Sequence, residues 1–261
     1  MVESLDLLVK TVLLRPYVFC FLALYLVIAW GEIGPLRTVV WLVLGYAIAF
    51  VCEYSSTRNG FPFGLYHYLD APTRGRELWI SNVPFMDSLS FVFLSFVSYA
   101  TARRLLGKEP DPKGRIEASL GVLFAASTLM LGIDLICDPV ALRGDRWFLG
   151  RLYYYAEPGG FFGVPLSNFL GWFFVAFTIV LAMAQLERFG LLGGRPGSLP
   201  LKPLWAPAFY LGLVLFNALI AFWIDLAGVG WLGLALVAAV GLAWWLRLAL
   251  AFGQPGLEQT S

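Results

Sequence analysis

Histidine and lysine are scarce in this chain, and their scarcity excludes two classes of membrane protein. His67 is the only histidine, so the chain cannot build the multi-histidine di-iron cluster of membrane oxygenases and desaturases. None of the four lysines lies in a long apolar run, so a helix bundle could not hold retinal as a Schiff base. No G-x-G-x-x-G motif follows a strand-like pattern, which leaves nucleotide and flavin binding without support. We therefore expect a protein that needs no cofactor and no metal.

Cysteine and charge are scarce as well. The three cysteines lie in or at the ends of apolar runs, where they resemble small hydrophobic residues rather than a disulfide or metal framework. The net charge of +1 gives no reason to expect nucleic acid as a partner. Only 13% of the residues are charged, whereas 59% are hydrophobic, and the mean hydropathy is +0.76. A soluble domain could not hide this much apolar surface, so the composition predicts an all-α polytopic membrane protein.

Seven apolar runs are long enough, or nearly so, to cross a membrane. A hydrocarbon core of ~30 Å needs about 20 residues of helix, and a helix closes its backbone hydrogen bonds internally. The first run follows Arg15 without a small-residue cleavage pattern, so we expect a retained span rather than a signal peptide. The predicted spans are Tyr17–Gly31, Leu36–Cys52, Pro84–Ala102, Ala118–Cys137, Pro165–Leu186, Pro203–Phe222 and Gly228–Leu250. We expect them to form one integral membrane domain over residues 1–261.

The connectors between the predicted spans alternate in character. Those at 103–117 and 187–202 are basic or rich in glycine and proline, whereas those at 53–83 and 138–164 are long and aromatic. Seven spans place the first pair on one side of the membrane and the aromatic pair on the other. Ten basic residues on the first side against eight on the second favour a cytoplasmic basic side. We therefore expect a multi-pass protein of the cell's inner (cytoplasmic) membrane with an outward N-terminus.

Carboxylate and amide side chains gather at the span ends on the aromatic side. An ionisable group at membrane depth costs about 2.5–3.5 kcal/mol on insertion scales, so several in one layer indicate a shared polar cavity. The opposite span ends show no comparable set of intramembrane carboxylates. Alternatively, some members are ordinary solvated helix ends, although Asp87 and Asp134 lie about a turn inside their helices. The group comprises Glu53, Asp87, Asp134, Asp138, Asn168 and Asp225.

A spacing of 81 residues recurs along the chain. It separates Glu53 from Asp134 (134 − 53 = 81). It also separates Asp87 from Asn168 (168 − 87 = 81), each of which ends a V-P-x-x-[D/N] helix start. In both units an acid ends a helix and an aromatic, glycine-bearing loop follows. We interpret the pattern as a possible internal repeat whose two copies line one pocket. The copies would span residues 36–102 and 118–186.

The residues that remain for chemistry are carboxylic acids, amides and aromatic rings near apolar space. They suit cofactor-free acid catalysis on an isoprenoid, because a carboxyl group in a dry pocket can donate a proton. Aromatic faces then stabilise a developing carbocation. His67 could relay a proton from the aqueous face, or it could belong to an interfacial aromatic belt. The candidate substrate-binding residues, each of which could instead pack at the membrane interface, are Phe61, Phe63, Tyr66, His67, Tyr68, Trp79, Phe161, Phe162 and Trp172.

Four stretches carry a resemblance to a known family. They are E-Y-S-S-T-R-N-G-F-P-F-G-L-Y-H-Y from Glu53, V-P-F-M-D-S from Val83, D-L-I-C-D-P-V-A from Asp134 and G-G-F-F-G-V-P-L-S-N-F-L-G-W from Gly159. They resemble the carotenoid biosynthesis proteins of the CruF type, which are membrane carotenoid 1′,2′-hydratases, over about residues 45–172. The resemblance implies that the chain adds water across the terminal double bond of an acyclic (ψ) carotenoid end group within membrane lipid. The product is a tertiary alcohol, which a downstream glycosyltransferase decorates in several pathways.

The implied hydration assigns provisional roles to the polar group. Protonation at C2′ would leave a tertiary cation at C1′, and a bound water would attack it. Asp134 is our first candidate for the acid because it is deepest in its helix, and Asp87 is the alternative. Asp138, Glu53 and Asn168 would hold and activate the water. Two rival classes stay open: a carotenoid cyclase or isomerase, which uses the same protonation, and a proton-coupled transporter, which usually needs access from both faces.

Overall fold

Seven helices long and apolar enough to cross a membrane form the body of the protein. The computed structural model describes residues 2–71 and 73–252, and each predicted span is a helix there. The spanning helices are α2 (Pro16–Ile33), α3 (Pro35–Asn59), α4 (Phe85–Leu105), α5 (Leu120–Ala141), α6 (Leu166–Arg188), α7 (Lys202–Trp223) and α8 (Ala227–Phe252). The protein is therefore an all-α polytopic bundle, as the composition predicts.

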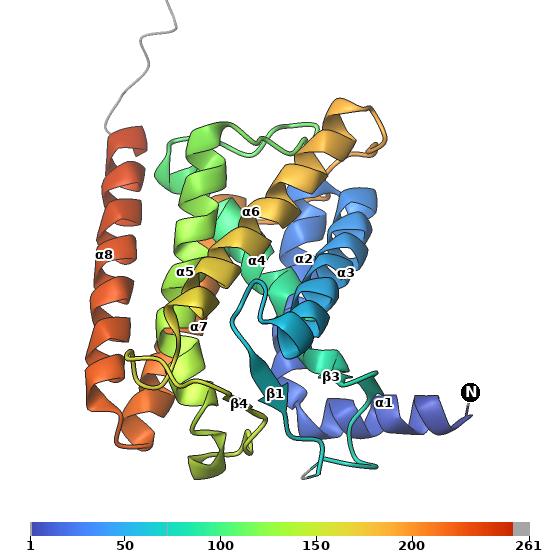
Figure 1. Cartoon of the computed structure of the whole chain (residues 1–261). Helices are drawn as coiled ribbons and strands as arrows, with labels where there is room; N and C mark the ends of the chain where they lie inside the picture. Colours follow the sequence, from blue (N-terminus) through green and yellow to red (C-terminus); the bar gives the residue numbers. More distant parts are fainter. Residues whose placement is uncertain (1, 72, 253–261) are drawn as a thin grey trace, which may run out of the picture.

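Helix α4 occupies the centre of the bundle, and the other spans surround it (Figure 1). Nearly every residue from Met86 to Arg104 is buried, including small polar residues such as Ser95. Trp41 of α3 donates its indole N–H to Ser95 Oγ at 3.1 Å. Small side chains let neighbouring helices approach closely in a membrane protein. Helix α8, by contrast, lies at the edge of the bundle against α7.

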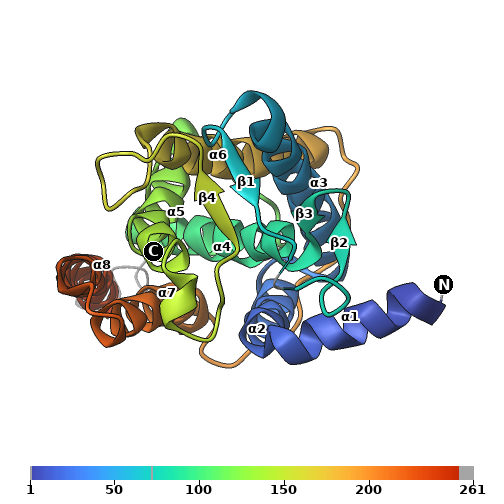
Figure 2. The same cartoon turned by 60° about the horizontal axis from the view of Figure 1, so that its bottom comes forward.

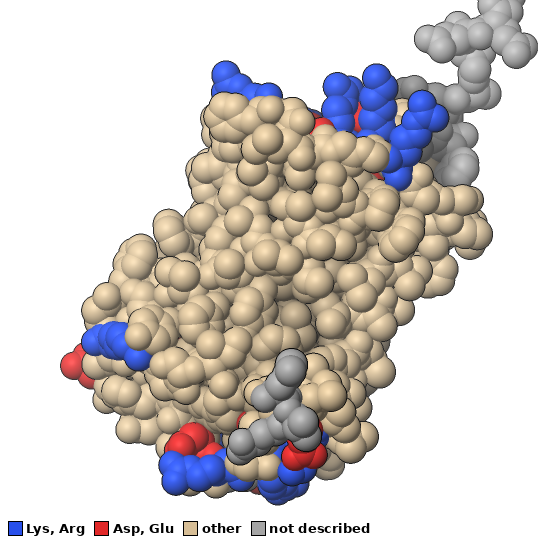
Figure 3. Space-filling view, turned by 90° about the vertical axis from the view of Figure 1, so that its right-hand side faces the viewer, with Lys and Arg blue, Asp and Glu red and all other residues tan. Residues whose placement is uncertain are grey.

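Charged side chains gather at the two ends of the bundle. On the face shown in Figure 3, a wide band without charged side chains separates them. Large apolar side chains are exposed on the outer surfaces of the spans, for example Val43, Leu170 and Trp245. So much exposed apolar surface is unfavourable in water and matches the hydrocarbon layer of a bilayer. The protein is therefore a multi-pass membrane protein; its orientation stays a prediction.

One helix was not predicted. Helix α1 (Val2–Leu14) precedes the first span and crosses the end of the bundle instead of running along the spans (Figure 1). Leu5, Val9 and Leu13 are exposed at intervals of four residues, so they form one apolar stripe. Such an amphipathic helix is typical of the membrane interface.

Helix α3 runs seven residues beyond its predicted end, from Cys52 to Asn59 (59 − 52 = 7). The added segment is polar, and Gly60 ends the helix in the left-handed region with a φ of 81°. The Gly60 N–H bonds to the Ser56 carbonyl oxygen, a common helix C-terminus that glycine adopts without strain. Because the helix continues past Cys52, Glu53 is buried in the helix wall and is not a solvated end.

Both aromatic connectors contain short strands, which the sequence did not predict. Strand β1 (Tyr66–Tyr68) pairs antiparallel with β4 (Tyr153–Tyr155). Strand β2 (Trp79–Ile80) pairs antiparallel with β3 (Val83–Pro84) just before α4. Figure 2 shows the β1–β4 ribbon lying over the end of the bundle, next to the start of α4. The ribbon therefore closes this end.

The 81-residue spacing reappears in three dimensions. Helix α4 begins at Phe85 and α6 at Leu166 (166 − 85 = 81). Phe91 and Trp172 are also 81 apart (172 − 91 = 81), and their ring centroids lie 4.6 Å from each other. The β1–β4 ribbon pairs one strand from each proposed copy. These features fit two copies that face one another, and the duplication itself stays a prediction.

The opposite end of the bundle adds to one expectation. A buried carboxylate does occur there: Glu32 Oε1 lies 2.7 Å from Arg104 Nη2, and both side chains are at most 5% exposed. Arg37 pairs with Glu187 at 2.7 Å nearby. The expectation of no comparable set of carboxylates at this end therefore needs one addition, the buried Glu32, which the sequence did not single out. Glu32 and Glu187 form ion pairs with arginine, whereas Glu53, Asp87, Asp134 and Asp138 at the ribbon end form hydrogen bonds with tyrosine or asparagine.

Candidate active site

Strand alternation decides which ribbon side chains face the bundle. Successive side chains on a strand point to opposite faces. On β1, Tyr66 and Tyr68 line the space beneath the ribbon, whereas His67 is exposed. Strand β4 repeats the pattern with Tyr153 and Tyr155 inside. Four tyrosine hydroxyls are thus presented to the polar ends of the spans.

The first cluster joins α3, α4 and β1. The Tyr68 hydroxyl lies 2.6 Å from Asp87 Oδ2 and 2.9 Å from Glu53 Oε1. Ser88 donates its hydroxyl to Glu53 Oε2, and the Tyr66 hydroxyl donates to Tyr68 at 3.3 Å. A hydroxyl carries one proton, so Tyr68 can donate to only one carboxylate at a time. Both short contacts are satisfied together when one carboxyl group bears a proton, so this cluster is built to hold one.

The second cluster joins α5, α6 and β4. Tyr153 and Tyr155 donate their hydroxyls to Asp138 Oδ1 and Oδ2, at 2.8 and 2.6 Å. Asn168 Nδ2 donates to Asp138 Oδ2 at 2.9 Å and to Asp134 Oδ2 at 2.8 Å. Asp138 therefore accepts three hydrogen bonds, an arrangement that stabilises negative charge. In the described part of the chain, Asp134 Oδ1 is buried without a hydrogen-bond partner.

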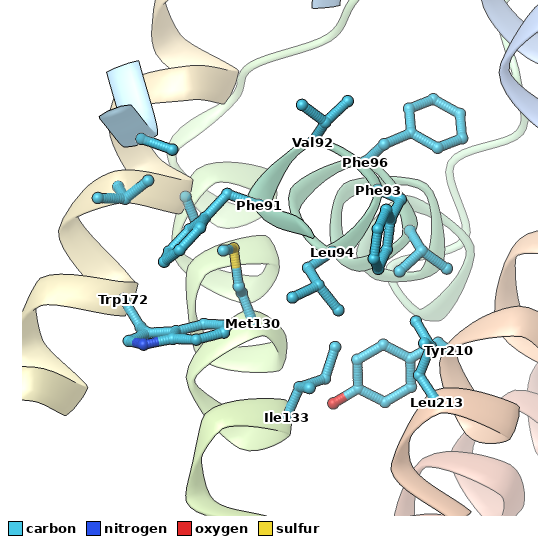
Figure 4. Close-up of a cluster of buried hydrophobic side chains, with 14 of the residues drawn as sticks. Phe91, Val92, Phe93, Leu94, Phe96, Met130, Ile133, Trp172, Tyr210 and Leu213 are labelled. Carbon is cyan, nitrogen blue, oxygen red and sulfur yellow. The ribbon is translucent and has the colours of Figure 1, made fainter. Parts of the chain in front are cut away.

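A cavity of about 130 Å³ lies beneath the ribbon and reaches both clusters. Its polar wall includes Glu53, Asp87, Asp138, Asn168 and the ribbon tyrosines, together with Ser90 and Asn217. The remaining wall is mostly apolar and aromatic, with Phe63, Phe91, Leu94, Ile133 and Trp172 among its residues. Figure 4 shows side chains of α4, α5, α6 and α7 converging in this region. Because an apolar cavity of about 150 Å³ holds a benzene molecule, this one has room for the end of a hydrocarbon chain beside acidic groups.

The ribbon tyrosines serve as hydrogen-bond donors. Burial raises the pKa of Tyr68 well above its ordinary value, and the negative charge of Asp87 raises it further. Burial also raises the pKa of Tyr153 and Tyr155, with Asp138 as the next cause. Their hydroxyls therefore keep their protons at neutral pH and orient the carboxyl groups that they contact.

Some predicted substrate-binding residues do line the cavity and others do not. Those that line it are Phe63, Tyr66, Tyr68 and Trp172. Those outside it, contrary to the prediction, are Phe61, His67, Trp79, Phe161 and Phe162. Phe61 is 58% exposed because it lies in the turn that follows α3. Strand alternation turns His67 outward, where it shares a separate polar pocket with Trp79.

Two predicted acids lie elsewhere than expected. Asp134 is fully buried but does not line the cavity, and its link to the cavity wall is Asn168. Depth along a helix does not set proximity to a site, because direction around the helix also matters; Asp138, one turn later, does line the cavity. Asp225 is exposed in the turn after α7 and takes no part in either cluster.

Sequence reasoning missed Tyr153 and Tyr155 as site residues. The signal was present as alternation, since Y-H-Y and Y-Y-Y each place two tyrosines on one face of a strand. Sequence reasoning also missed Tyr17 and Phe21 of α2 and Phe216 of α7, which line the cavity. Nothing in their local sequence distinguishes them from other aromatic residues of the spans.

Metal ligands do not gather at this site. Among residues 2–71 and 73–252, no group of three or more His, Cys, Asp or Glu side chains is arranged to hold a metal ion. The groups that the cavity offers are carboxyls, an amide, hydroxyls and aromatic faces. That the reaction needs no cofactor stays a prediction.

Fold and site together define a membrane-embedded protein with an acidic, aromatic cavity for an apolar molecule. Comparison with known families agrees with this class. The family model described as "Carotenoid biosynthesis protein" matches residues 11–243 of the chain. The chain belongs to this family and therefore has a role in carotenoid biosynthesis, which indicates an enzyme. No curated protein matches the chain, and no solved structure matches it.

Proposed function

We propose that this protein is a carotenoid 1′,2′-hydratase, which adds water to the terminal double bond of an acyclic carotenoid end group. One observation carries the proposal: the 130 Å³ cavity is apolar along most of its wall and has two carboxyl clusters at one end. Hydration of an alkene needs an acid, a water site and a dry surface for the hydrocarbon. The cavity offers carboxyl groups, further polar groups that can hydrogen-bond a water, and an apolar wall for the hydrocarbon.

Asp87 is the proposed proton donor. Unlike Asp134, it lines the cavity, and its Oδ2 atom lies 2.6 Å from the Tyr68 hydroxyl. Transfer of its proton to C2′ forms a C–H bond from the π electrons and leaves a tertiary cation at C1′. The faces of Phe91 and Trp172 offer their quadrupoles to this cation. Asp138, which accepts three hydrogen bonds and lines the same cavity, offers the cation a negative charge.

Water capture completes the reaction. The oxygen of a bound water forms the C1′–O bond, and the resulting oxonium group releases one proton. Glu53 also lines the cavity and is the proposed acceptor of that proton. Tyr68 contacts both Glu53 and Asp87, so its hydroxyl can pass a proton from the first to the second and restore the acid. The balance is one alkene plus one water giving one tertiary alcohol, with the enzyme unchanged.

The test is expression in a lycopene-producing host, followed by mass analysis of the pigments. A hydratase adds the mass of one water and forms a tertiary hydroxyl, with no requirement for oxygen. A cyclase or isomerase, which shares the protonation step, would leave the mass unchanged. The Asp87→Asn variant, made in the same host, shows whether the product depends on the proposed acid. On this proposal, a glycosyltransferase that modifies tertiary hydroxyls is the expected downstream partner.

A further inference from the structure

The cavity is much smaller than the molecule that the proposed function requires it to bind. Pockets that enclose a drug-sized ligand measure about 300–1,000 Å³, whereas this cavity measures about 130 Å³. A carotenoid is a long, methyl-branched polyene, larger than such a ligand. Only its end group fits inside, so the remainder of the chain must leave the cavity through one of its walls.

One way out is polar and does not suit a hydrocarbon. Tyr68 separates the cavity from a second pocket of about 500 Å³ outside the ribbon. Asp70, Arg74, Glu77 and His67 contribute to the walls of that pocket. Placing a polyene there would bury charged groups against hydrocarbon, which is costly. This side suits water, not the tail of the substrate.

A second part of the cavity wall lies between α2 and α7 and is aromatic. Tyr17 and Phe21 of α2 and Phe216 of α7 line the cavity, and all three remain partly exposed. The Tyr17 and Phe216 rings are stacked with centroids 6.2 Å apart, and Phe21 meets Phe216 at 5.7 Å. Because they line the cavity and are also partly exposed, these rings lie between the cavity and the outer surface of the bundle. No charged side chain belongs to this part of the wall.

Gly212 leaves a gap on the lipid-facing side of this aromatic group. Phe21 contacts Phe216 and also Phe209, with ring centroids 5.9 Å apart in the second pair. Gly212 lies between Phe209 and Phe216 on α7 and is exposed, and a Cβ atom built there would meet nothing within 4 Å. Cys20 and Leu24 of α2 are exposed on the other side of the gap. Exposed apolar residues of α2 and α7 thus border Gly212 on the lipid-facing surface, and we call this strip of surface the groove.

We propose that the polyene tail of the carotenoid passes between α2 and α7 and lies in this groove, while its end group occupies the cavity. The inference rests on the proposed function and adds the binding site for the rest of the substrate. Tyr17, Phe21 and Phe216 form the portal, and Gly212 keeps the groove open. The substrate therefore reaches the acids laterally from the bilayer and never crosses the aqueous face.

The experiment fills the groove and compares two substrates. In full-length protein, Gly212→Phe places a ring over the gap, where the free space at this position permits folding. We expect KM for a full-length acyclic carotenoid to rise about tenfold or more, because the new ring occupies space that the polyene would fill; one hydrophobic group that does not fit its site has an effect of about this size. KM for a short acyclic terpene with the same end group, which fits inside the cavity, should change much less. The matched control is Gly121→Phe near the start of α5, an exposed glycine whose added side chain would meet Leu106, at the end of the bundle opposite the ribbon.

A direct contact measurement separates this proposal from the proposed function. A photoreactive phenylalanine analogue at position 212 should cross-link to bound carotenoid, and the same analogue at position 121 should not. If wild-type protein hydrates the carotenoid but the Gly212→Phe variant affects both substrates equally, or position 212 gives no cross-link, the groove proposal is wrong. If wild-type protein gives no hydrated product, the proposed function is wrong, and cross-linking at position 212 still reports whether a carotenoid lies there.

Discussion

Replacement of Asp87 by asparagine tests the proposed acid. The amide has nearly the same shape, and its oxygen can still accept the hydrogen bond that Tyr68 donates at 2.6 Å. What is lost is the proton that would be transferred to C2′. General acid catalysis contributes about 10²–10⁴-fold to a rate, so kcat should fall by that order while KM stays close to its wild-type value.

The assay is the initial rate of hydrated pigment formation in membranes or nanodiscs, normalised to folded protein by size-exclusion chromatography and thermal unfolding. Ser90→Ala, which alters another cavity-lining residue without removing an acid, serves as the control. A well-folded Asp87→Asn variant with more than about a tenth of wild-type kcat would refute the assignment of Asp87 as the acid, given the range expected for general acid catalysis.

Three further predictions follow from the same contacts. Asp134→Asn should lower kcat less than Asp87→Asn does, because Asp134 reaches the cavity only through Asn168; equal losses of kcat in folded protein would contradict this. Arg15→Met should lower the free energy of unfolding by about 3–5 kcal/mol, because Glu77 then lacks its buried partner at 3.0 Å. The Arg15→Met/Glu77→Met double variant should recover much of that loss. Burial raises the pKa of the ribbon tyrosines, so unfolding releases their protons once the pH exceeds about 10, the ordinary tyrosine pKa. These groups should therefore leave thermal stability unchanged below that pH and lower it above. A Tyr155→Phe variant should show a smaller fall.

The spans could be predicted because membrane depth fixes a simple requirement. An apolar run of about 20 residues must be helical in lipid, and each of the seven runs is a helix in the described residues. The ends were less predictable. Helix α3 continues through a polar segment to Gly60, because Ser56 and Gly60 form its C-terminal hydrogen bond, and this continuation is what buries Glu53.

The polar layer was predictable, but its internal arrangement was not. Carboxylate and amide side chains at the ends of apolar runs indicated Glu53, Asp87, Asp138 and Asn168, which line one cavity. Their partners come from a ribbon whose two strands lie 85 residues apart along the chain (153 − 68 = 85). Pairing at such a separation between three-residue strands leaves no local signature beyond alternation. The same limit explains why the sequence favours Asp134 over Asp87 as the proton donor. Depth along a helix can be read from the sequence, but the neighbour that a side chain faces cannot.

The mass of the pigment formed from an acyclic carotenoid tests the central claim most directly. Full-length protein, expressed in a lycopene-producing host and kept strictly anaerobic, should convert the pigment to one that is heavier by one water and carries a tertiary hydroxyl. Growth or incubation in ¹⁸O-labelled water should place the label in that hydroxyl. A product of unchanged mass, or a hydroxyl whose oxygen comes from molecular oxygen, would contradict the account.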